Sequence, residues 1–154
     1  MTTFSITPNP QTAFGELLTG ALDQKISLRF DYNINTRQVS TTTTNSATIT
    51  QSNSKAVLST GTTTGSDATL DSRDLLKYNN GLGILARFTA VFTIGVANTV
   101  QRIGLGDSTD GFHFGYDGAT FGIFRYQNSS KTFTAQSSWN VDVMDGTGPS
   151  GVTQ

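Results

Sequence analysis

Residues 112–126 have the sequence FHFGYDGATFGIFRY, and this stretch decides the fold. Apolar and polar or small residues alternate on both sides of Asp117-Gly118, a dipeptide typical of the tight turn in a β-hairpin. The pattern predicts two antiparallel strands, at Phe112–Tyr116 and Thr120–Tyr126. The alternation fits a half-buried sheet with one apolar face.

The single histidine of the chain, His113, lies in the first of these strands. We expect Phe112 and Phe114 to face the core and His113 to point to the opposite side. A histidine can activate a serine or threonine nucleophile, but no G-x-S-x-G elbow accompanies this one. Paired glycosidase carboxylates are also missing, because the only glutamate is Glu16 and no acidic residues alternate along one strand. The sequence therefore predicts no catalytic residue and a protein that is not an enzyme.

Other short apolar or alternating stretches lie on both sides of the hairpin. Ile84–Val96 is apolar on both faces except at Arg87, which predicts a central, covered strand. No strand–helix–strand alternation occurs, so the sheets should be antiparallel, as in a β-sandwich or jelly roll. The remaining predicted strands are Ile26–Tyr32, Ala47–Thr50, Lys55–Ser59, Ala68–Leu70, Val100–Leu105 and Lys131–Gln136, with a turn at Asn53-Ser54.

A polar tract of residues 35–64 has two interpretations. Its Thr and Ser content is typical of a disordered linker. Alternation persists within it and proline is absent, which favours strands instead.

The composition excludes several classes of protein. The 154 residues fit one domain, with a net charge of −1, 35% hydrophobic and 14% charged residues, and 26 Thr and 15 Ser. No cysteine is present for a disulfide or thiolate site, and no 18-residue apolar run exists to insert into a membrane. A pI near 5.6 without a basic cluster argues against a nucleic-acid partner.

The N-terminal residues differ from the rest of the chain. An apolar stripe at helical spacing follows Pro8 and Pro10, and it predicts either a short helix or an extended arm that docks on a neighbour. We therefore divide the chain into a docking arm at residues 1–24 and a β-sandwich domain at residues 25–154. The candidate assembly contacts are Phe14, Leu17, Leu18 and Leu22.

Two ligand hypotheses remain open from the residues alone. Asp107 and Asp110 lie in a Gly-flanked loop with two hydroxyl residues, an oxygen-rich set that suits Ca²⁺, although such loops are also ordinary turns. No other cofactor is expected. A sugar site would use exposed aromatic and amide side chains, and the available residues are Trp139, Tyr116, Tyr126 and Asn128.

Four stretches in this order resemble a family of largely uncharacterised virus structural proteins found in tailed phages and large DNA viruses. They are Thr12–Leu17, Ala86–Phe92, Gly115–Ile123, and Ala135–Trp139 with Asp145–Gly148. The resemblance implies an antiparallel sandwich of jelly-roll character, similar to laminin-G or concanavalin-like lectin domains, and no catalytic residues. Members of the family run on past the Asp-Gly-Thr-Gly segment, so the domain is expected to be incomplete at its C-terminus.

The function that this resemblance implies is structural. We expect a virion protein of the surface fibre, appendage or capsid-associated type, located in the virion. We expect it to form a homo-oligomer, namely a trimer, and to assemble with other virion proteins. The alternative is a carbohydrate-binding module for a host surface glycan, and a polysaccharide depolymerase ranks below it.

Overall fold

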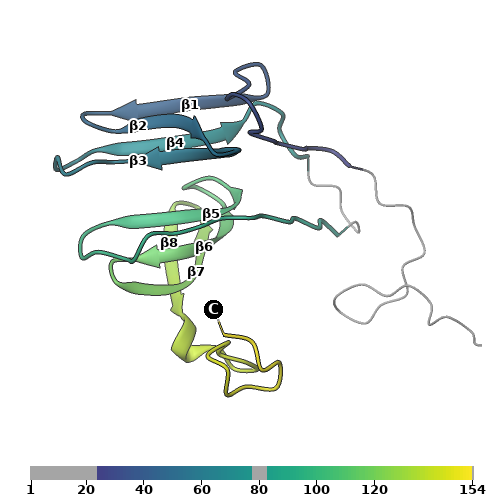
Figure 1. Cartoon of the computed structure of the whole chain (residues 1–154). Coiled ribbons are helices and arrows are strands. Elements are labelled where there is room, and N and C mark those ends of the chain that lie inside the picture. The colour runs from purple at the N-terminus through teal and green to yellow at the C-terminus, as the bar shows by residue number, and fades with distance from the viewer. Residues whose placement is uncertain (1–23, 78–82, 154) are drawn as a thin grey trace, which may run out of the picture. The chain divides into compact units, whose positions relative to one another are not determined.

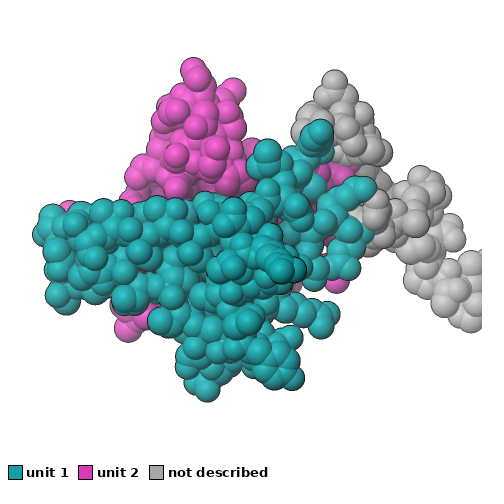
Figure 2. Space-filling view, turned by 90° about the horizontal axis from the view of Figure 1, so that it is seen from above, with its two compact units in different colours: residues 1–80 teal, residues 81–154 magenta. Residues whose placement is uncertain are grey.

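The computed structural model of the protein describes residues 24–77 and 83–153. This part of the chain holds eight antiparallel strands and one three-residue 3-10 helix, η1 (Gln136–Ser138) (Figure 1). The predicted all-β class with antiparallel sheets is therefore confirmed, and the sheets are consistent with a β-sandwich. The chain divides into two compact units, residues 1–80 and 81–154, which Figure 2 colours separately.

Unit 1 contains two antiparallel ribbons. Strand β1 (Val39–Thr44) pairs with β4 (Asp67–Ser72), and β2 (Thr48–Ser52) pairs with β3 (Lys55–Ser59). Asn53 and Ser54 both have positive φ angles, as the two-residue turn between β2 and β3 requires. The strand interpretation of the polar tract is thus confirmed over most of its length, as is the Asn53-Ser54 turn.

Unit 2 is built on a four-stranded meander. Strands β5 (Val100–Gly106), β6 (Gly111–Asp117), β7 (Thr120–Gln127) and β8 (Ser130–Ala135) lie side by side in chain order. The hairpin predicted from residues 112–126 is β6–β7, with Asp117 opposite Thr120. The turn into β8 uses Asn128 and Ser129, again with positive φ angles.

The core of unit 2 lies on the face opposite to the predicted one. His113 is only 6% exposed and Phe124, opposite it on β7, is 0% exposed. Phe112 and Phe114, by contrast, are 62% and 46% exposed. The prediction that the two phenylalanines face the core and His113 faces outward is therefore wrong. We call the His113–Phe124 side the inner face and the Phe112–Phe114 side the outer face.

Glycines explain why this face became the inner one. Gly115 and Gly122 are paired at the centre of the sheet, and both are buried. A Cβ on Gly115 would collide with the carbonyl oxygen of Gln101, and one on Gly122 with that of Thr134. Because no side chains stand here, the edge strands β5 and β8 approach the centre closely and the sheet coils around its inner face.

An ion pair supports this coiling. Lys131 is the second residue of β8, beside the β7–β8 turn, whereas Asp117 ends β6 at the opposite end of the ladder. Their charged groups nevertheless lie 2.8 Å apart. A flat sheet would hold residues at opposite ends of the ladder well apart, since each residue adds about 3.3 Å along a strand. The sheet of unit 2 is therefore strongly coiled.

Two predicted strands are not strands in the structure. Residues 26–32 and 84–96 form no β-pairing within the described part of the chain, although their alternation fits a β-strand. Side-chain amides bind them instead: Gln51 Nε2 donates to the Phe30 carbonyl at 2.9 Å, and Gln101 binds Thr93. A strand needs a partner backbone, and sequence alternation alone does not supply one.

Candidate functional site

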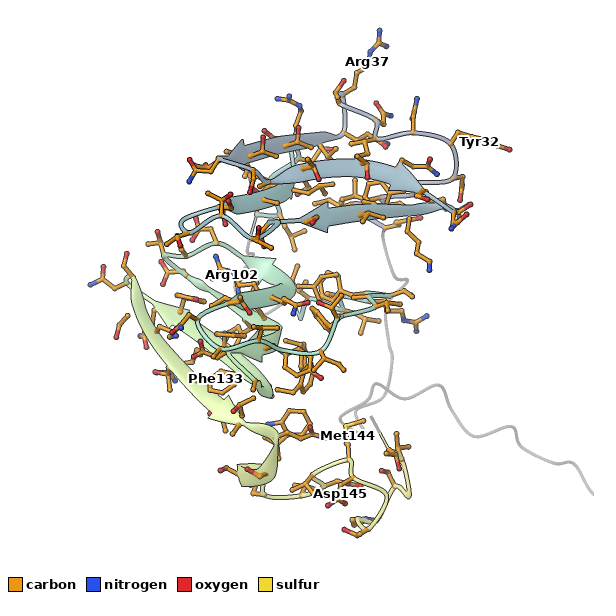
Figure 3. All side chains as sticks on the ribbon, turned by 60° about the vertical axis from the view of Figure 1, so that its left-hand side comes forward. Tyr32, Arg37, Arg102, Phe133, Met144 and Asp145 are labelled. Atoms are coloured by element: carbon orange, nitrogen blue, oxygen red, sulfur yellow. The ribbon has the colours of Figure 1, made fainter. Side chains whose placement is uncertain are left out.

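The inner face of unit 2 holds an aromatic cluster. The His113 and Tyr126 rings meet edge to face at 5.7 Å, and Tyr126 stacks on Phe124. The Arg102 guanidinium lies 4.8 Å from the centre of the Tyr126 ring. Arg102 on β5 and Phe133 on β8, both labelled in Figure 3, flank the cluster from the two outer strands. His113 is thus buried against the Tyr126 ring and acts as a packing group of this core.

A second ring cluster lies on the outer face. Phe92 contacts Tyr116 and Phe121 edge to face, each at 6.0 Å. Trp139 contacts Phe121 at 6.4 Å from beyond β8. Of the four residues considered for sugar binding, Tyr116 and Trp139 thus belong to this cluster, and Tyr126 belongs to the inner one. Asn128 lies in the β7–β8 turn, so the structure does not bring the four together.

The two loop aspartates considered for Ca²⁺ each bind backbone amides. The Asp107 carboxylate accepts hydrogen bonds from the amides of Thr109 at 2.6 Å and Asp110 at 3.0 Å. The bonds from the Asp110 and Thr109 amides hold the pKa of the Asp107 carboxyl below its usual value. Asp110 accepts from the amide of Asn128 in the neighbouring turn at 3.0 Å. These carboxylates cap the β5–β6 loop and tie it to the β7–β8 turn.

A second pair of aspartates organises the C-terminal loop, which contains Met144 and Asp145 (Figure 3). Asp142 accepts from the amides of Met144 and Ser150 at 2.7 and 2.8 Å. Hydrogen bonds from Ser150 and Met144 lower the pKa of Asp142. Those from the hydroxyl and amide of Thr147 lower the pKa of Asp145. These hydrogen bonds favour the charged form of both carboxylates.

Neither aspartate pair belongs to a larger cluster of metal-ligating side chains. Across residues 24–77 and 83–153, no group of three or more His, Cys, Asp or Glu side chains gathers to hold an ion. An open depression of about 320 Å³ lies beside the C-terminal loop, but Asp145 is the one carboxylate among the residues that line it. The described residues also include no helix with the length and apolar character to cross a membrane.

The outstanding feature of unit 2 is uncovered apolar surface. Most of it lies on the unpaired segment 84–96 and on the outer face of β6, and the rest lies at Val100, Val141 and Val152. We call the exposed residues of the segment and of β6 the apolar surface: Ile84, Leu85, Phe88, Val91, Ile94, Val96, Phe112 and Phe114. The sequence pattern, apolar on both faces except at Arg87, predicted a central, covered strand here. The signal that could have revealed its exposure is the lack of a second apolar strand of matching length to cover it.

The predicted assembly contacts Phe14, Leu17, Leu18 and Leu22 lie outside the described residues, as does almost all of the predicted docking arm. They remain a prediction. Comparison with protein-family models, with curated proteins and with solved structures found no match to this chain.

Proposed function

We propose that this protein is a structural subunit that works by associating with copies of itself. Its setting in this proposal is the surface of a virus particle, as a fibre, appendage or capsid-associated component that also contacts other virion proteins. The virion setting rests on the sequence resemblance. The associating function rests on the distribution of apolar side chains.

The observation that carries the proposal is the contrast between buried and exposed hydrophobic residues. Among the described residues, Val39, Ala47 and Phe124 are the buried hydrophobic ones, whereas fifteen large hydrophobic side chains are exposed. Monomeric soluble proteins rarely expose contiguous apolar patches of more than a few hundred Å², and larger ones mark interaction sites. A subunit that completes its core by association accounts for this contrast.

The low charge of the chain fits the same proposal. With charged residues at 14%, against about a quarter in typical domains, few surfaces carry the like charges that keep proteins apart. The proposal includes the finer form of the fold, a lectin-like jelly-roll sandwich. In that form, strands of neighbouring subunits complete the layers that one chain leaves uncovered.

The test is the solution mass of the full chain, measured by light scattering over a wide range of concentrations. We expect a stable oligomer, with three times 16.4 kDa as the reference mass. A mass of 16.4 kDa at every concentration would contradict self-association. Circular dichroism on the same samples controls for unfolding, since a misfolded chain also aggregates but loses its β signal.

A further inference from the structure

The segment at residues 84–96 runs as an extended trace (Figure 1) but forms no β-ladder with the rest of the described chain. Its outward side chains include Val91, 82% exposed, and Ile94, 88% exposed. An extended segment without ladder partners presents backbone donors and acceptors to its surroundings, as an edge strand does. Thr93 binds the Gln101 side chain and the Val96 carbonyl accepts from Thr99, but the other backbone groups of the segment make no hydrogen bond to another described residue. Its apolar side chains are also uncovered.

One end of this segment is fixed to the sheet. The Gln101 side chain imitates a neighbouring peptide group, because its Oε1 accepts from the amide of Thr93 at 3.2 Å and its Nε2 donates to the Thr93 carbonyl at 3.3 Å. The Phe92 ring packs on Tyr116 and Phe121 of the outer face. These contacts hold this end of the segment against the outer face of the sheet, whereas the Val91 and Ile94 side chains stay exposed.

We propose that the apolar surface of unit 2, defined above by its eight residues, is where a second copy of this chain binds. The proposal rests on the self-associating function proposed above and names the surface that performs it. It involves β-pairing of segment 84–96 across the interface, with Phe112 and Phe114 buried beside it.

The area of the surface matches what a stable dimer contact needs. At about 200 Å² for a fully exposed large side chain, the exposed fractions of the eight residues leave roughly 1,000 Å² accessible. A standard protein–protein interface buries about 800 Å² on each partner. One neighbouring subunit is therefore sufficient to cover the surface.

The charge pattern favours a second copy over an unlike, charged partner. Arg87 is the one charged residue among residues 84–96. A nearly neutral surface meets its own copy without like-charge repulsion and offers a charged partner little attraction. A second copy also brings the same set of free backbone groups, which segment 84–96 requires for pairing.

The test compares two exposed apolar sites. Val91→Asp and Ile94→Asp place a charge on the proposed surface, and Leu75→Asp places one on a side chain of unit 1 that is 86% exposed. All three positions are exposed, so each variant should fold, which circular dichroism verifies. We expect Val91→Asp and Ile94→Asp to weaken self-association at least tenfold by light scattering, and Leu75→Asp to leave it unchanged.

The outcomes separate this inference from the proposed function. If the wild-type chain associates and the Val91→Asp and Ile94→Asp variants associate equally well, the function stands and this surface is wrong. If the wild-type chain is a monomer, both fail. An additional measurement uses the absence of cysteine in the chain. Ile94→Cys should form an inter-chain disulfide under mild oxidation much faster than Leu75→Cys, and equal rates would overturn the proposal.

Discussion

Replacement of Phe124 by alanine tests which face of the unit 2 sheet forms its core. The Phe124 ring is fully buried and its centre lies 4.8 Å from that of Phe133. Its removal loses the transfer free energy of the ring and leaves a cavity, at a cost of about 3–5 kcal/mol. Phe112 is 62% exposed, so its replacement loses only part of the ~1.5–3 kcal/mol of full burial, or about 1 kcal/mol.

The assay is urea unfolding followed by tryptophan fluorescence. Trp139 is the only tryptophan and contacts Phe121 of β7, so its emission reports on unit 2. Both variants are measured at a concentration where the chain is monomeric, which removes any contribution of a partner to Phe112. We expect Phe124→Ala to lose several times more unfolding free energy than Phe112→Ala. Equal losses, or a larger loss at Phe112, would refute the assignment of the inner face.

Three further perturbations follow from the local geometry. Gly122→Ala should destabilise unit 2 by about 1–3 kcal/mol in the same urea assay, because the added Cβ would collide with the backbone of β8. Gly83→Ala is the control: there is open space around Gly83, so the stability should change by no more than about 0.5 kcal/mol. Gln101→Ala should accelerate hydrogen exchange of the Thr93 amide by about tenfold, since it removes the acceptor of that amide; an unchanged rate would mean that the Gln101 clamp does not hold the segment. Because the pKa of Asp142 is lower in the folded than in the unfolded chain, its carboxylate stabilises the fold above the unfolded pKa, near 4, and this stability is lost as pH falls through the folded pKa. The difference in unfolding free energy between the wild type and Asp142→Asn, measured in urea, should therefore shrink below about pH 4. A difference that grows as the pH falls would contradict this sign.

Local signals in the sequence located most of the strands. The Asp117-Gly118 and Asn53-Ser54 turns each joined two alternating stretches, and both hairpins exist in the structure. Turn chemistry and alternation act over a few residues, so a single sequence carries them. The same information was sufficient to favour strands over a disordered linker in the polar tract.

The inner face could not be chosen in this way. Alternation separates β6 and β7 into two faces, and both carry aromatic rings: Phe112 and Phe114 on one, Phe124 on the other. The choice depends on how closely the outer strands approach Gly115 and Gly122, which is a property of the assembled sheet. Two glycines that stand opposite each other in the hairpin are the sequence signal that could have indicated the inner face.

Pairing partners and site geometry were also beyond the sequence. Segment 84–96 has the pattern of a core strand, yet whether it is covered depends on a partner backbone that the described chain does not supply. The Asp107 and Asp110 carboxylates were correctly placed in one loop. Their hydrogen bonds to Thr109, Asp110 and Asn128 depend on the loop conformation and on a turn 18 residues further along the chain.

The glycine pair at the centre of the unit 2 sheet has a consequence for evolution. No L-amino acid side chain fits at Gly115 or Gly122 without displacing the backbone of an adjacent strand. Exposed threonines such as Thr132 meet no such limit and are free to drift. In a diverged descendant of the same ancestor, these two glycines, seven positions apart across a short turn, should outlast most of the surrounding sequence. Distant homologues of this protein would then be recognisable from these two conserved glycine positions.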